Sequence, residues 1–173
     1  MKRFFIYSML ITIIMLINGC GGSVSEAVND ALSGLQGKHV NEDIIDNKTT
    51  TILFNVSTNY KTITNVPLIV LDIKHQRMGD LKIELTDPSG TTVILSHYRG
   101  GNNSVDGISF EYDAPTSVVN FNNSTKEYKP EEDISKFTGD KANGIWVLKI
   151  RDSVNNSKTG KITRVALIIN GVK

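Results

Sequence analysis

The fold class is decided by Leu81-Lys82-Ile83-Glu84-Leu85-Thr86-Asp87-Pro88-Ser89-Gly90-Thr91. Its first six residues alternate apolar and polar side chains, which is the pattern of a strand with one buried face. The next four are typical of a β-turn, with Asp first, Pro presetting φ at the second position and Gly fourth. A second alternating stretch, 146–151, follows the turn pair Asn143-Gly144. These patterns predict strands joined by tight turns.

Other short apolar segments extend this pattern through most of the chain. Further strand candidates cover 52–57, 67–75, 91–96, 108–112 and 162–170. No amphipathic helix separates them, although a loop-rich segment covers 114–141. We therefore expect an all-β, jelly-roll-like β-sandwich in which Trp146 fills the space between two sheets.

The N-terminus has the three parts of a secretory signal. Lys2 and Arg3 precede an apolar run, Phe4 to Ile17, and Gly19 stands before the single cysteine, Cys20. The end of this segment resembles a bacterial lipobox, which implies a signal peptide over 1–19 and a lipid on Cys20. The alternative is an uncleaved N-terminal membrane anchor. Either interpretation predicts that the rest of the chain lies outside the cytoplasm.

A short helix is predicted after the signal. Val24, Val28, Leu32 and Leu35 share one helical face, so a helix is expected over Ser25 to Leu35. It would act as a spacer within a lipidated tether, 20–40, or as a short coiled-coil or docking helix. The sandwich is then expected over 41–173.

Composition narrows the class of protein further. The chain has 173 residues and a formal net charge of +1, and without Lys2 and Arg3 this falls to about −1. No basic patch stands out, which argues against nucleic acid as a partner. A single cysteine excludes an intramolecular disulfide.

Three stretches together resemble the P domain (Homo B domain) of subtilisin-like proprotein convertases. They are Val70 to Leu85, Asp87 to Gly101, and Tyr128 to Ile162 with its Gly144-Ile145-Trp146 segment. The resemblance covers about 41–173 and implies a jelly-roll module that stabilises and regulates a protease. Met78 stands where relatives often carry Arg, so an Arg-Gly-Asp motif is absent. The family's P domain usually follows a catalytic domain, for which this chain is expected to have no room.

No catalytic residues are expected in this chain. The histidines His39, His75 and His97 have no nucleophile signature near them, and zinc and phosphate-loop motifs are missing. Gly79 is expected to let the chain turn, and Asp80 to accept hydrogen bonds from nearby backbone amides.

Calcium is the best candidate cofactor. Asp46, Glu111, Asp113 and Asp152 lie near the predicted strand ends, and carboxylates are the ligands that Ca²⁺ prefers. The alternative is that these are ordinary turn carboxylates that cap amides or face water.

Three functions fit these features. The first is a non-catalytic, lipid-anchored binding or accessory module at the bacterial cell envelope, with an outer-membrane or surface position favoured and an envelope protein as partner. The second is service to a subtilisin-like serine protease in trans. The third is a carbohydrate-binding jelly roll, with Tyr98, Arg99, Tyr112 and Tyr128 on the sugar-binding face.

Overall fold

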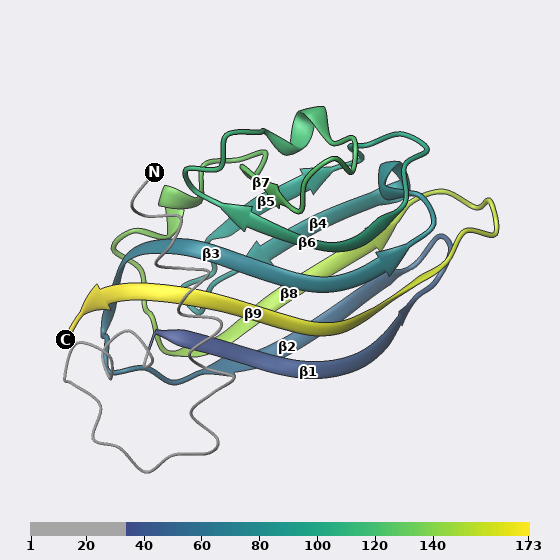
Figure 1. Ribbon diagram of the computed structural model, residues 1–173. Coiled ribbons are helices and arrows are strands. Elements are labelled where there is room, and N and C mark those ends of the chain that lie inside the picture. The colour runs from purple at the N-terminus through teal and green to yellow at the C-terminus, as the bar shows by residue number, and fades with distance from the viewer. Residues whose placement is uncertain (1–33) are drawn as a thin grey trace, which may run out of the picture.

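Two β-sheets pack face to face in the computed structural model, which describes residues 34–173 (Figure 1). The five-stranded sheet has the order β1 (Leu35–Ile44), β9 (Gly160–Val172), β3 (Thr62–His75), β6 (Val105–Glu111) and β7 (Glu127–Tyr128). The four-stranded sheet has the order β2 (Thr49–Val56), β8 (Gly144–Asp152), β4 (Leu81–Thr86) and β5 (Thr92–His97). Most connections cross from one sheet to the other, which is the jelly-roll arrangement. The predicted all-β, jelly-roll-like sandwich is confirmed.

The core lies between the sheets, where the alternating residues predicted it. Leu81, Ile83 and Leu85 of β4 are fully buried, whereas the side chains between them are partly exposed. Trp146 is also fully buried and meets Phe137 edge-on, with ring centroids 5.2 Å apart. Its indole N–H donates to the Ala142 carbonyl at 3.2 Å, so the polar atom of this large side chain is satisfied.

The predicted turn after β4 is present. The amide of Gly90 donates to the Asp87 carbonyl at 3.1 Å, and Gly90 has φ +95°, a conformation that L side chains rarely adopt. One Asp87 carboxylate oxygen accepts from the amides of Ser89 and Thr91, both at 2.9 Å. The turn therefore has the backbone and side-chain bonds that its sequence indicates.

Strand β1 corrects the predicted boundary of the sandwich. It begins at Leu35 and pairs with β9, so residues 35–40 belong to the sheet and not to a tether or helix. The sequence hid this strand because β1 is an edge strand with most side chains exposed and only Ile44 fully buried. Lys38 Nζ donates to the Leu53 carbonyl at 2.9 Å and ties β1 to the edge of β2.

The remaining N-terminal predictions lie outside the described residues. These are the signal peptide over 1–19, the lipidation of Cys20 and the helix before residue 34. Within 34–173, no helix has the length and apolar character needed to cross a membrane.

Short elements interrupt the strands at two places. The 3₁₀-helix η2 (Met78–Asp80) separates β3 from β4, and the predicted loop-rich segment carries η3 (Val118–Asn120), β7 and η4 (Ile134–Phe137). In β3, register shifts lie between Ile63 and Leu68 opposite β9. Such bulges bend a strand and redirect its side chains.

Candidate functional site

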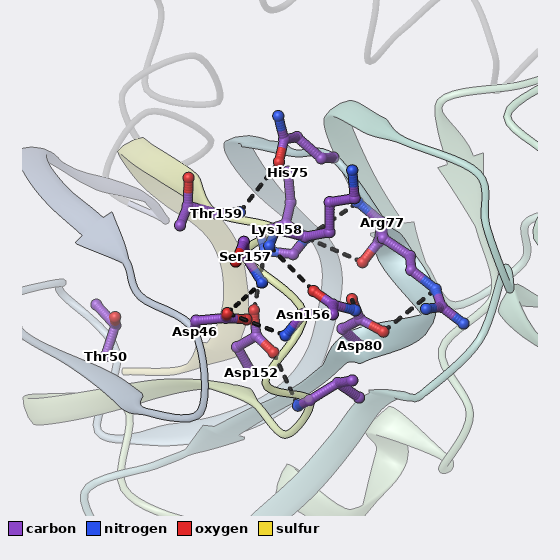
Figure 2. Close-up of polar contacts among 12 residues, drawn as sticks. Asp46, Thr50, His75, Arg77, Asp80, Asp152, Asn156, Ser157, Lys158 and Thr159 are labelled. Atoms are coloured by element: carbon purple, nitrogen blue, oxygen red, sulfur yellow. Dashed lines mark hydrogen bonds and ion pairs between the residues drawn. The ribbon is translucent and has the colours of Figure 1, made fainter.

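Buried polar side chains gather where β3 and β8 end (Figure 2). His75 is the last residue of β3 and Asp152 is the last residue of β8. The His75 Nε2 lies 3.1 Å from the Asp152 Oδ2, and neither side chain has exposed surface. Because β3 and β8 belong to different sheets, this pair joins the two layers of the sandwich.

The second ring nitrogen of His75 is also occupied. Its Nδ1 lies 2.9 Å from the Arg77 carbonyl and 3.2 Å from the Arg77 amide. Gly160 of β9 lies against this ring, and a Cβ there would come within 2.5 Å of His75 Cδ2 and 2.2 Å of the Lys74 carbonyl. The imidazole is therefore held from both nitrogens and packed against a backbone that has no space for a side chain.

Asp80 in η2 is the second buried carboxylate of this site. Its Oδ1 lies 3.3 Å from Arg77 Nε, an ion pair without the angle of a hydrogen bond. Its Oδ2 accepts from Asn156 Nδ2 at 2.9 Å. The prediction that Asp80 binds backbone amides is wrong, because side chains fill both of its carboxylate oxygens.

Gly79 lies in the 3₁₀ turn η2, so the chain turns at this residue as predicted, and the lack of a side chain has a second role there. A Cβ at this position would lie 2.4 Å from the Gly101 carbonyl, and the Gly79 amide donates to that carbonyl at 3.1 Å. The missing side chain therefore allows two backbone segments to approach closely, and Gly79 itself does not have a positive φ.

Asp46, in the β1–β2 turn, is the third carboxylate. Its Oδ2 accepts from the backbone amides of Asn156, at 3.0 Å, and Ser157. Its Oδ1 is buried and has no hydrogen-bond partner within residues 34–173. Asn156 therefore connects two carboxylates, with its amide on Asp46 and its side chain on Asp80 (Figure 2).

The electrostatics of the cluster follow from its burial. Burial raises the pKa of the Asp152 carboxyl, and the charges of Asp80 and Asp46 raise it further. The Val154 amide, 3.1 Å from Asp152 Oδ1, and the charge of His75 act in the opposite direction. The cluster balances like charges against fixed donors, which is the arrangement that lets carboxylates remain buried.

Within this cluster, the side chains of His75 and Asp152 have no contact with solvent. A general base must reach the proton that it removes, but His75 is sealed and both of its nitrogens have partners. The hydroxyl of Ser153 is hydrogen-bonded to the Tyr98 hydroxyl at 2.6 Å, and the imidazole has its partners elsewhere, at Asp152 and the Arg77 backbone. Over residues 34–173, no group of three or more His, Cys, Asp or Glu side chains is arranged to hold a metal ion.

The four predicted calcium ligands do not form one site. Asp46 and Asp152 lie at this end, whereas Glu111 pairs with Leu68 in the ladder between β6 and β3. From Leu68 to His75 an extended strand covers roughly 20 Å. Glu111, and with it Asp113 two residues later, therefore lies at the opposite end of the sandwich from Asp46 and Asp152. Calcium binding by a smaller set stays a prediction, and melting curves in calcium and in chelator test it.

Negative charge is concentrated around Glu111. Burial raises the pKa of this carboxyl to about 7, and the charges of Glu127 and Asp113 contribute to the rise.

The predicted aromatic face does not exist as one surface. Tyr98 lies at the end of the sandwich that holds the His75 cluster, because its amide donates to the carbonyl of Leu81, the residue that pairs with Asp152. Tyr112 directly follows β6 and lies at the opposite end. Tyr128 is fully buried, with its ring 5.0 Å from that of Phe121. Arg99 donates to Glu131, with the Nε at 3.0 Å, and so ties β5 to the long loop.

The other two histidines are exposed. His39 lies on the edge strand β1, and His97 ends β5 with its ring 4.7 Å from that of Tyr98. Their positions give no support for a nucleophile activated by histidine.

Sequence reasoning missed two features of the molecule. One is the role of Asn156 and Ser157, for which the signal was an Asn-Asn-Ser run soon after a strand that ends in Asp. The other is a carboxyl pair at the far end, where Asp87 lies close to Asp140. Burial raises the Asp87 pKa to about 6, and the nearby charge of Asp140 adds to the rise. No local pattern indicated that pair, because 53 positions separate its members.

The sequence pattern of the proprotein convertase P-domain matches residues 67–169, which is more than half of the chain and includes His75, Asp80 and Asp152. The chain belongs to this family. Two solved structures share the fold. One is a chain in the crystal structure of the Aeromonas sobria serine protease with the chaperone (23% identity, TM-score 0.55, 80% of this chain and 26% of that chain).

The second is the serine protease of Aeromonas sobria itself (21% identity, TM-score 0.50, 78% of this chain and 26% of that chain). The P-domain chain thus spans about a quarter of the length of the structures that it matches. No curated protein sequence matches it.

Proposed function

We propose that this P-domain chain is a lipid-anchored, non-catalytic accessory module that serves a serine protease at the bacterial cell envelope. The family assignment over 67–169 is the observation that supports it most. The sealed His75–Asp152 pair agrees with a structural and not a chemical role. The matched Aeromonas protein is a serine protease crystallised with a chaperone, which supports a protease as the class of partner.

The proposed anchor is a lipid on Cys20, which follows a charged start and an apolar run. A lipid would hold the module at the envelope, with an outer-membrane or surface position favoured. The Cys20→Ser variant should then move from the membrane fraction to the soluble fraction, whereas Ser23→Ala should stay with the membrane. An unchanged membrane fraction in Cys20→Ser would make the apolar segment, and not the cysteine, the anchor.

The proposed partner is tested by crosslinking in cells. Full-length chain with a C-terminal tag should recover a subtilisin-like serine protease after crosslinking and purification, identified by mass spectrometry. A matched sample that carries Cys20→Ser separates partner binding from anchoring, because the folded module is unchanged and only its location differs. Recovery of other envelope proteins and no serine protease would contradict the proposed partner while leaving the anchor intact.

A further inference from the structure

A hollow of about 210 Å³ lies at the end of the sandwich opposite the His75 cluster. It is bounded by the start of β3, a strand that begins at the left of Figure 1, by the residue after β6, and by η4. Val66 and Ile134 are buried and form an aliphatic floor. Thr64, Asn65, Ser135, Thr138 and Tyr112 are exposed and form the walls. Pockets for drug-sized ligands are larger, at about 300–1,000 Å³, so this one fits a single ring.

The bulged start of β3 produces this hollow. Two register shifts against β9, between Ile63 and Asn65 and between Asn65 and Leu68, give β3 extra residues at this point. Bulges redirect side chains, and here Thr64 and Asn65 both face solvent at the rim. Within residues 34–173, their side chains and the Tyr112 hydroxyl have no hydrogen-bond partner, so these groups are available to a ligand.

The chemistry of the lining points to an uncharged, polyhydroxylated ligand. No Lys, Arg, His, Asp or Glu lines the hollow. Hydroxyl and amide groups that both donate and accept suit sugar hydroxyls. Tyr112, with 52% of its surface exposed, lines the hollow together with an aliphatic floor, and an aromatic ring at such a place suits the C–H face of a sugar ring.

Two other ligand classes fit less well. An extended peptide binds by adding its backbone to a free strand edge, but the Ile63 amide and carbonyl already bond to Asp140 and Gly139, both at 2.8 Å. A phosphate or other anion would find no basic side chain in the lining and would meet the carboxylate of Asp113 beside Tyr112.

We propose that the hollow between Thr64–Val66, Tyr112 and η4 binds one neutral pyranose ring of an envelope glycan. The site is independent of the proposed protease partner and of the anchor. It differs from the sugar-binding face predicted from sequence, because only Tyr112 of the four predicted residues contributes to it.

Saturation-transfer NMR on the full-length chain in a sugar-free detergent tests this site. The probes are the methyl glycosides of glucose, galactose and mannose, N-acetylglucosamine, and glucuronate as the charged comparison. We expect saturable binding of at least one neutral probe in the millimolar range, weaker binding of glucuronate, and a loss of about tenfold in Tyr112→Ala. Tyr98→Ala is the matched control, since Tyr98 is also exposed but lies at the other end, and it should bind as the wild type does.

Asn65→Ala gives a second reading that does not depend on the aromatic ring, and it should also weaken binding. The proposal is overturned by the absence of saturable binding of all neutral probes at about 50 mM, which is well beyond the expected range. Equal affinity in Tyr112→Ala and wild type, or preference for glucuronate over every neutral probe, would overturn it as well.

Discussion

The His75 Nε2 and the Asp152 Oδ2 lie 3.1 Å apart with no exposed side-chain surface, and they join the last residues of β3 and β8. In a catalytic triad, this contact would orient a base toward a nucleophile. Here the other ring nitrogen of His75 is bonded to the Arg77 backbone, so the imidazole is not directed at a nucleophile. It holds the two sheets together at the end where three loops meet.

Removing His75 should therefore destabilise the fold strongly. His75→Ala leaves Asp152 buried without its partner, and a broken buried pair costs about 3–5 kcal/mol. The control is Arg164→Ala, which removes a partly exposed pair with Asp72 at 2.8 Å and should cost less than about 1 kcal/mol. Urea unfolding measures the free energy of unfolding of both variants. Equal losses of stability would show that the buried pair stabilises the fold no more than the exposed pair does.

Asp46 should control the order of the β8–β9 loop. Its Oδ2 accepts from the amides of Asn156 and Ser157, so Asp46→Ala leaves both donors without a partner. Hydrogen exchange over 153–159 should become at least about tenfold faster, which corresponds to about 1.4 kcal/mol of lost protection. Asp43→Ala, which removes an exposed ion pair with Lys161, should leave that exchange unchanged. Unchanged exchange in Asp46→Ala would mean that other contacts hold the loop.

The Asp87–Asp140 pair should make stability fall as pH rises. Burial and Asp140 raise the folded-state pKa of Asp87 to about 6 from an ordinary value of 3.8, so the folded chain binds this proton more tightly than the unfolded chain. The stability that this proton gives is fully present below about pH 4 and is lost as pH rises through about 6. The loss amounts to roughly 2–3 kcal/mol at most, from about 1.4 kcal/mol for each pH unit.

Asp87→Asn tests that dependence. The side-chain carbonyl of the new asparagine can still accept from the amides of Ser89 and Thr91. Its NH₂ group is uncharged at every pH, so it faces Asp140 without the charge repulsion of a second carboxylate. Unfolding free energies at pH 4, 5.5 and 7 should show the variant gaining on the wild type as pH increases. A constant difference between the two over this range would show that the pKa of Asp87 is not raised in the folded chain.

Local sequence patterns predicted the parts of this fold that depend on local chemistry. Leu81, Ile83, Leu85 and the turn at 87–90 behave as their spacing indicates, because burial of alternate residues and the φ of Gly90 are local requirements. Strand β1 was missed because an edge strand is stabilised by backbone pairing with β9, which leaves little trace in its mostly exposed side chains.

The candidate sites depend on contacts between residues far apart in the chain, and local sequence patterns predict such contacts less well. Asp46 and Asp152 lie near one another at one end of the sandwich, whereas the antiparallel ladder puts Glu111 at the other end, and calcium binding by any of the four predicted carboxylates stays a prediction. The sugar-sized hollow depends on the bulges between Ile63 and Leu68, which no residue pattern revealed.

The most direct test of the proposed function is reconstitution with the serine protease that crosslinking identifies. The full-length chain alone should hydrolyse no peptide substrate above the background of a buffer blank. Added to the protease at equal concentration, it should form a complex on size exclusion and lengthen the half-life of protease activity on heating. Peptidase activity in the chain alone, or a protease that neither binds it nor gains stability from it, would contradict an accessory, non-catalytic role.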